Sequence, residues 1–108
     1  MPNRIEKINH LILKELAFLI QREFPEKFIT VISVETTADL KQAKVWVSQY
    51  GQKDGQVLDL LQGEATPFQT ALSKKLFIKN FPRLIFIIDK SAEYMEKVDR
   101  LLHKTTSK

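Results

Sequence analysis

The sequence has 108 residues and a mass of 12.6 kDa, with 44% hydrophobic residues, which is the size and apolar content of one compact domain. It contains no cysteine, which excludes disulfides, thiolate metal sites and a cysteine nucleophile. Its three glycines, at positions 51, 55 and 63, fit neither of the common glycine-rich phosphate loops. The net charge of +4 permits an anionic partner without requiring one.

Nothing in the sequence indicates a membrane protein. The longest apolar runs, residues 16–20 and 84–88, are far shorter than the roughly 18 residues that suggest a membrane span. The N-terminus is charged from the start and lacks the apolar region of a secretory signal. We therefore expect a cytoplasmic protein with no membrane partner.

The first expected element is a helix over residues 4–24, where apolar residues recur in steps of three and four. Asn3 is a suitable N-cap for this helix. Pro25 ends it, because proline disfavours the helical conformation at the residue before it.

Two strands are expected next, over residues 28–35 and 43–50, joined as an antiparallel hairpin by the polar residues 36–42. In the second strand, Trp46 and Tyr50 lie on the face opposite the apolar positions. Two interpretations are open. The aromatic rings stack on unpaired bases, or Trp46 packs across the hairpin and stabilises the sheet without a ligand.

A broken helix is expected over residues 56–78. Gly63 suits the end of its first half. Thr66 is predicted as the N-cap of the second half, Pro67 as its first helical residue and Gln69 as the partner that completes a capping box.

The last expected elements are a strand and a helix. Residues 84–88 are continuously apolar and predict a buried central strand. A helix is then expected from a cap at Ser91 to about His103, followed by a polar tail over residues 104–108 that we expect to fray. The order predicts an α+β fold, with a three-stranded sheet and helices on one face.

The residues do not indicate catalysis. His10 and His103 lie near opposite ends of the chain, and no nucleophile elbow is present. Asp39 and Asp89 flank expected strands, where an aspartate is typically a turn or cap residue. We expect no enzyme, and no metal, cofactor or small-molecule substrate.

Positive charge is concentrated in one part of the chain. Residues 65–88 contain no acidic residue but hold Lys74, Lys75, Lys79 and Arg83. One interpretation is a common basic surface that neutralises the phosphates of a nucleic acid. The other is a solvated helix face that keeps the domain soluble.

Two segments carry a resemblance to a known family. Residues 34–48, VETTADLKQAKVWVS, fit the pattern V-E-x-x-x-D-L-x-x-A-K-V-x-V, and residues 82–91, PRLIFIIDKS, fit P-x-L-x-F-x-x-D-x-S. On these motifs the chain resembles the bacterial ribosome-binding factor A family over about residues 4 to 102. The family has the element order of a type II KH domain, and like the family this chain lacks the G-x-x-G loop of KH proteins.

The sequence departs from the family at the helix break. Family members usually carry Ala-x-Gly between the two half-helices. Here the matching residues are Ala65-Thr66-Pro67, with a one-residue gap downstream, or Glu64-Ala65-Thr66 without a gap, and neither supplies the glycine. Proline removes one backbone donor and a capping Thr66 would occupy another. We therefore expect this helix start to bind anions weakly.

The resemblance implies a single KH-like domain over residues 1–108 and a function in assembly of the small ribosomal subunit. It implies a monomeric factor that binds free or immature 30S subunits and assists late maturation and processing of 16S rRNA near its 5′ region, often linked with growth in the cold. From the charge pattern we predict phosphate contact by Lys74, Lys75, Lys79 and Arg83, with Lys44 and Arg4 as weaker candidates. Two alternatives remain open, a general KH-like module for single-stranded RNA and a protein-interaction module that uses the half-exposed sheet.

Overall fold

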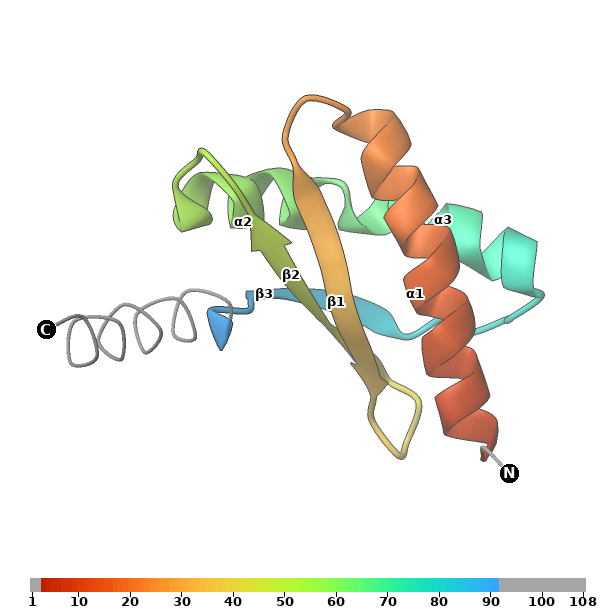
Figure 1. Ribbon diagram of the computed structural model, residues 1–108. Helices are drawn as coiled ribbons and strands as arrows, with labels where there is room; N and C mark the ends of the chain where they lie inside the picture. The colour runs from red at the N-terminus through yellow and green to blue at the C-terminus, as the bar shows by residue number, and fades with distance from the viewer. Residues whose placement is uncertain (1–2, 92–108) are drawn as a thin grey trace, which may run out of the picture.

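The structure is a computed structural model that describes residues 3–91 (Figure 1). Three helices and three strands follow one another in the order α1 (Arg4–Glu23), β1 (Ile29–Thr36), β2 (Gln42–Gln49), α2 (Asp54–Gly63), α3 (Ala65–Leu76) and β3 (Arg83–Ile88). The expected α+β class and element order are confirmed within these residues. The predicted last helix lies beyond them except for Ser91, and so does the predicted tail.

Helix α1 begins and ends as its sequence predicts. Asn3 Oδ1 accepts a hydrogen bond from the Glu6 N–H at 2.8 Å, and the Glu6 carboxylate accepts one from the Asn3 N–H at 3.3 Å. This reciprocal pair is a capping box, which satisfies two free donors of the helix start. At the other end, Phe24 is the C-cap and its N–H still donates to the Ile20 carbonyl. The helix stops there because Pro25 follows.

The three strands form one mixed sheet in the order β1-β2-β3. The pairing of β1 with β2 is antiparallel, so the predicted hairpin is confirmed. Strand β3 pairs in parallel with β2, which makes β2 central and β3 an edge strand. The prediction that residues 84–88 form the central strand is therefore wrong.

The apolar sequence of β3 has another physical origin. Leu84 and Phe86 are buried on the face that the helices cover, whereas Ile85 and Ile87 are half-buried on the opposite face. Both faces of the strand are thus partly covered although one of its edges has no neighbouring strand. A continuous apolar run can report such two-sided burial without a central position.

Two glutamines satisfy the free edge of β3. Gln69 Oε1 accepts a hydrogen bond from the Leu84 N–H at 3.0 Å. Gln62 accepts from the Phe86 N–H at 3.3 Å and donates from Nε2 to the Leu84 carbonyl at 3.0 Å. Backbone groups that an edge strand would leave unpaired therefore have partners from α2 and α3. Gln69 consequently does not complete a capping box, which corrects that prediction.

The break between α2 and α3 is a single residue, Glu64, with φ −98° and ψ 5°. Helix α3 begins directly after it at Ala65, so Thr66 is its second residue and Pro67 its third. No side chain caps this helix start, and the predicted roles of Thr66 as N-cap and of Pro67 as first residue are wrong. Proline is tolerated because N–H groups in the first helical turn have no partner within the helix.

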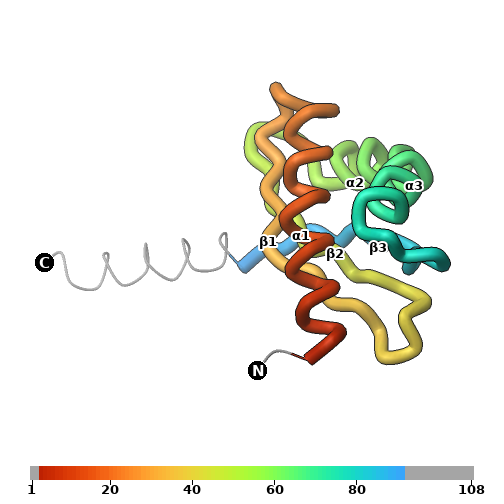
Figure 2. The backbone as a smooth tube through the Cα atoms, turned by 90° about the vertical axis from the view of Figure 1, so that its right-hand side faces the viewer, coloured from red at the N-terminus to blue at the C-terminus, as the bar shows by residue number. Residues whose placement is uncertain are grey.

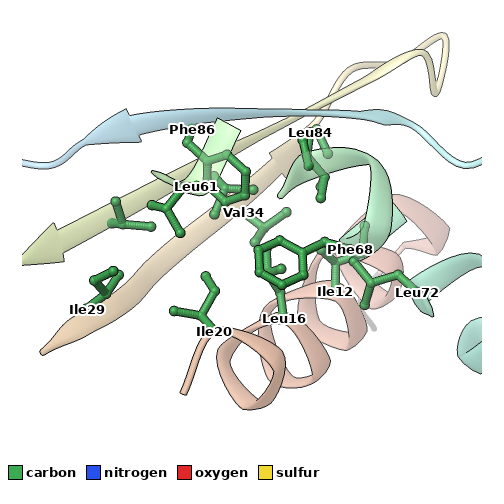
Figure 3. Close-up of a cluster of buried hydrophobic side chains, with 14 of the residues drawn as sticks. Ile12, Leu16, Ile20, Ile29, Val34, Leu61, Phe68, Leu72, Leu84 and Phe86 are labelled. Atoms are coloured by element: carbon green, nitrogen blue, oxygen red, sulfur yellow. The ribbon is translucent and has the colours of Figure 1, made fainter. Parts of the chain in front are cut away.

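One apolar core joins all six elements, with the helices on one face of the sheet (Figure 3). Helix α1 packs along β1, whereas α2 and α3 pack against β3 (Figures 1 and 2). The core consists of Ile12, Leu16, Ile20, Ile29, Val34, Ala43, Val45, Val47, Val57, Leu61, Ala65, Phe68, Leu72, Leu84 and Phe86. Of the helices within residues 3–91, none is long and apolar enough to cross a membrane.

A polar contact ties α1 to the end of β1. Thr36 is buried, and both its backbone N–H and its hydroxyl donate to Asn9 Oδ1, the former at 2.9 Å. A buried donor without a partner would cost about 1–3 kcal/mol, so this acceptor fixes the position of the first half of α1 against the sheet.

Candidate nucleic-acid interface

The C-terminal end of α3 and the turn after it carry a basic surface. Lys74 and Lys79 are both exposed and border a surface hollow of about 480 Å³. The other residues that line it are Gln69, Thr70, Ser73, Asn80 and Phe81. None of these side chains is acidic, so a phosphate in the hollow would meet two cations and several hydrogen-bonding groups.

The turn after α3 holds the two lysines on either side of this hollow. Phe77, the C-cap, adopts a left-handed conformation with φ 56° and donates its N–H to the Ser73 carbonyl. The Ile78 N–H donates to the same carbonyl at 3.1 Å, and the Ser73 hydroxyl donates to the Ile78 carbonyl. The Ser73 carbonyl in the last turn of the helix thereby has two donors, and the chain reverses toward β3 within a few residues.

Lys75 lies on a different side of α3. It borders a smaller hollow of about 250 Å³ between α3 and α1, together with Glu15 and Arg22. The Arg22 guanidinium lies 5.8 Å from the centre of the Phe18 ring, within range of a cation–π contact. The structure therefore separates Lys75 from Lys74 and Lys79, with which the sequence grouped it.

Arg83 and Lys44 share the face of the sheet that the helices leave open. Arg83 is the cross-strand partner of Gln42, and Lys44 is the partner of Ile85, so alternation places both cations on the same face. Both side chains are exposed. Glu35 stands directly opposite Lys44 on β1, and this opposite charge makes Lys44 the weaker candidate of the two.

The structure places a further cation, Lys41, beside Arg83, which the sequence pattern did not predict. Lys41 is exposed, and its carbonyl accepts a hydrogen bond from the Arg83 N–H at 2.9 Å. The signal was indirect, because the parallel pairing of β2 with β3 brings the residues at the start of each strand together. Recognising Lys41 therefore required the correct strand order.

Asp39 serves the hairpin turn, as expected. Its carboxylate accepts from the Thr37 hydroxyl at 2.6 Å and from the Lys41 N–H at 3.0 Å. These hydrogen bonds, the one from Thr37 first, hold the pKa of the Asp39 carboxyl below its ordinary value, and the Lys41 charge adds a smaller effect in the same direction. Asp89 likewise accepts from Ser91, which lowers its pKa, so it too is a turn residue.

Arg4 is the first residue of α1 and is exposed. The contact between Asn9 and Thr36 places the start of α1 at the end of the sheet where the hairpin loop lies (Figure 1). Arg4 is thus at the same end of the sheet as Lys41.

The residues of the helix break present little positive charge. Ala65 is buried, Thr66 and Pro67 are exposed, and Glu64 places a carboxylate at the junction. A helix start attracts anions through its free N–H groups and dipole. Here a proline removes one donor and an acid adds repulsion, so the break is a poor phosphate site.

The aromatic residues of β2 differ in exposure. Trp46 is half-buried between its cross-strand partners Ser33 and Ile87, an environment that favours packing within the sheet. Tyr50, just beyond the end of β2, is 80% exposed. Trp46 and Tyr50 therefore do not form a joint surface on the open face on which bases could stack.

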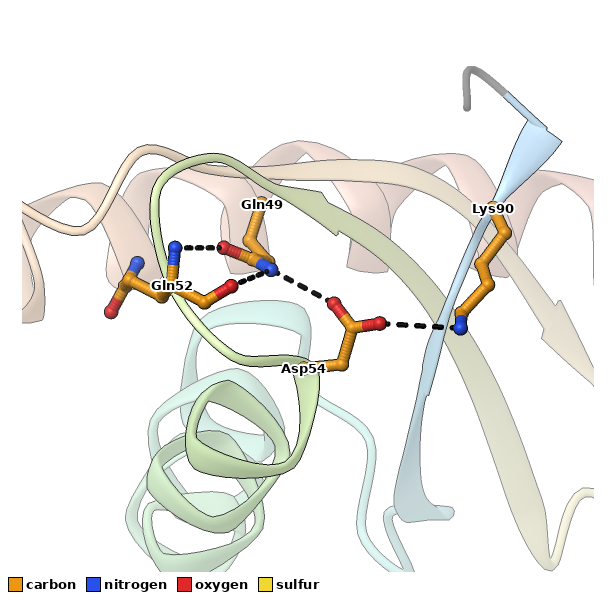
Figure 4. Close-up of polar contacts among 4 residues, drawn as sticks. All are labelled: Gln49, Gln52, Asp54 and Lys90. Carbon is orange, nitrogen blue, oxygen red and sulfur yellow. Dashed lines mark hydrogen bonds and ion pairs between the residues drawn. The ribbon is translucent and has the colours of Figure 1, made fainter. Parts of the chain in front are cut away.

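At the end of β2 away from the hairpin loop, a polar cluster engages another cation (Figure 4). Gln49 Nε2 donates to Asp54 Oδ1 at 2.8 Å and to the Gln52 carbonyl at 2.6 Å. The Lys90 ammonium lies 3.5 Å from the other oxygen of Asp54. Because its charge is offset, Lys90 is not a candidate for phosphate contact. Over residues 3–91, no three His, Cys, Asp or Glu side chains gather in a way that could hold a metal ion.

The fold is that of a KH-like α+β domain, with a helix, a hairpin, a broken helix and an edge strand in this order. No glycine-rich loop stands at the helix break. A family model described as ribosome-binding factor A matches residues 4–102. The chain belongs to the ribosome-binding factor A family.

Relatives and solved structures agree with this assignment. The chain is 39% identical to ribosome-binding factor A of Akkermansia muciniphila, over 96% of this chain and 91% of the relative. The crystal structure of the Thermus thermophilus factor has the same fold, with a TM-score of 0.72 at 20% identity over 80% of this chain and 97% of that one. A homology model of the Thermus factor, fitted into the cryo-EM map of a 30S-RbfA complex, matches with a TM-score of 0.66 at 26% identity over 76% and 91% of the two chains.

Proposed function

We propose that this chain is a ribosome assembly factor that binds free or immature 30S subunits in the cytoplasm and assists late maturation and processing of 16S rRNA near its 5′ region. Membership of the family is the observation that carries the proposal. It is supported by the related factor whose homology model was fitted into the map of a 30S complex.

The surface at the end of α3 supplies a physical basis for such binding. Lys74 and Lys79 border a hollow without acidic lining, and they contact phosphates of a folded RNA. Arg83 extends the contact onto the open face of the sheet, and Lys75, Lys44 and Arg4 are secondary contacts. Each neutralised phosphate releases counterions, so the affinity falls steeply with salt.

The proposed action is binding without catalysis. One monomeric domain recognises the RNA surface while it is still accessible, and it dissociates once maturation closes that surface. No group of the chain has to transfer an atom for this cycle. The proposed link with growth in the cold follows from the same action, because misfolded RNA rearranges more slowly at low temperature.

Sedimentation of a lysate through a sucrose gradient tests the function. We expect the tagged chain to travel with free small subunits and to be absent from translating ribosomes. We also expect its loss to raise the fraction of 16S rRNA with an unprocessed 5′ end. Comigration with polysomes, or equal affinity for short unpaired oligonucleotides and for 30S subunits, would contradict the proposal.

A further inference from the structure

Phe77 is an unusual residue for the place it occupies. Its side chain is 94% exposed, the largest value among the large hydrophobic residues of the described chain. It is also the C-cap of α3 with φ 56°, a conformation that glycine or asparagine normally supplies. Backbone crowding disfavours a bulky side chain there, and water disfavours an exposed ring. The left-handed backbone caps the helix end, but a phenylalanine side chain adds nothing to that cap.

The surroundings of Phe77 are cationic and polar. Lys74 and Lys75 occupy the preceding turn of α3, and Lys79 follows two residues later. Residues 65–88 hold no acid, and the hollow between Lys74 and Lys79 adjoins the same turn. Phe77, with its strained backbone and exposed ring, thus lies in the turn that joins Lys74 to Lys79.

This setting favours a nucleotide over an apolar protein surface as the ligand. A protein contact of this kind centres on a contiguous apolar patch that excludes water. Leu76 and Ile78 flank Phe77 directly, but they are only half-exposed, as is Phe81 in the lining of the hollow. The exposed residues around them are lysines and Asn80. An aromatic ring among phosphate-binding cations is the usual arrangement for stacking an unpaired base.

We propose that the turn after α3 holds one unpaired nucleotide of the bound RNA. The Lys74 and Lys79 side chains contact the flanking phosphates at the hollow, and the Phe77 ring stacks on the base. This inference rests on the proposed function, and it adds that the factor recognises a single-stranded position within a structured RNA.

A second phenylalanine provides a matched control. Phe28 also has a positive φ, of 50°, and is 70% exposed. It lies before β1, where Glu26 is two residues away and Lys27 stands beside it. The two residues share side chain, backbone conformation and exposure but differ in local charge.

The test measures affinity for purified bacterial 30S subunits over a series of salt concentrations. We expect Phe77→Ala to weaken binding roughly ten-fold, the lower part of the range measured for aromatic stacking on one base. The salt dependence should keep its slope, because stacking releases no counterions. We expect Phe77→Trp to bind like the wild type, and Phe28→Ala to leave affinity unchanged.

Phe77→Gly separates strain from recognition. Glycine suits the left-handed conformation, so this variant should fold at least as well as the wild type while binding as weakly as Phe77→Ala. Thermal unfolding of every variant checks the fold.

Three results would overturn the inference. Full affinity of Phe77→Ala would show that the ring makes no contact, and full affinity of Phe77→Leu would indicate an apolar protein contact instead of stacking. In both cases the wild type still binds, so the proposed function stands. Failure of the wild type to bind 30S subunits would remove the proposed function and this inference together.

Discussion

The two ends of α3 show how one helix divides packing from recognition. At its start, Glu64 breaks the helix and Gln69 reaches the edge of β3. At its end, Lys74 and Lys79 border an open hollow beside the exposed ring of Phe77. The start is committed to the sheet, whereas the end is free to meet a ligand.

Helix electrostatics explain why this division is unusual. A helix start normally attracts anions, and a helix end favours cations because of the negative pole of its dipole. In this chain an acid and a proline weaken the first effect. The lysines at the end are stabilised by the dipole and remain exposed, so they combine a structural and a binding role.

The largest expected effect comes from reversing charge at the end of α3. We expect Lys74→Glu with Lys79→Glu to weaken binding to 30S subunits on the order of 100-fold at low salt, since attraction to phosphate becomes repulsion. The slope of log affinity against log salt should fall by about two. A salt series of binding isotherms measures both quantities.

A matched double variant controls for net charge. Lys27 and Lys53 are exposed and lie away from α3, near the ends of β1 and β2 opposite the hairpin loop. Lys27→Glu with Lys53→Glu changes the net charge equally and should reduce binding far less. Equal losses of affinity in the two double variants would mean that only the overall charge matters. That result would contradict a specific binding role for the end of α3.

The second largest effect concerns Gln62 on α2, just before the helix break, and should change stability but not binding. We expect Gln62→Leu to lower the free energy of unfolding by about 1–3 kcal/mol, because the Leu84 carbonyl and the Phe86 N–H lose their partner. Urea unfolding measures this loss, and subunit binding of the folded variant should be unchanged. Gln56 is exposed on the same helix, so Gln56→Leu is the control. A variant of Gln62 as stable as the wild type would show that the edge of β3 needs no such partner.

A smaller effect distinguishes the observed helix start from the one the sequence suggested. An N-cap residue contributes about 1 kcal/mol, and Thr66 makes no such contact. We expect Thr66→Ala to change stability by less than about 0.5 kcal/mol, whereas Asn3→Ala in the capping box of α1 should cost about 1 kcal/mol. Thermal or urea unfolding measures the free energy of unfolding of both variants. An equal loss of stability at both positions would show that Thr66 is a cap after all.

The smallest effect concerns Asp39 in the hairpin loop, away from both ends of α3. The lowered pKa of Asp39 means that its carboxylate stabilises the fold at neutral pH, and that this contribution is lost as pH falls below about 3.9 and through the lowered folded value. We expect Asp39→Ala to be less stable than wild type at pH 7 and to match it near pH 2. A stability difference that grew on acidification would have the wrong sign.

Much of the fold followed from local sequence signals. Asn3 and Pro25 set the limits of α1, and alternation in residues 43–50 predicted the hairpin, because caps and strand periodicity act over a few residues. The position of β3 could not be read in this way. Its apolar run reports burial, whereas its place at the edge depends on a crossover through α2 and α3.

The candidate site was predictable as a charge pattern but not as a surface. The acid-free residues 65–88 identified Lys74 and Lys79, but only the helix geometry separates Lys75 toward α1. Phe77 gave no signal, because a phenylalanine after a helix usually packs inward. Sequence periodicity encodes neither its left-handed backbone nor its exposure.

Photocrosslinking from the two ends of α3 tests the central claim most directly. A photoreactive amino acid is placed at position 79 or at position 66, both of which are exposed. Each variant is irradiated on purified 30S subunits. We expect position 79 to crosslink to 16S rRNA and position 66 to give no RNA crosslink. Crosslinking to RNA from position 66 but not from position 79 would contradict the account.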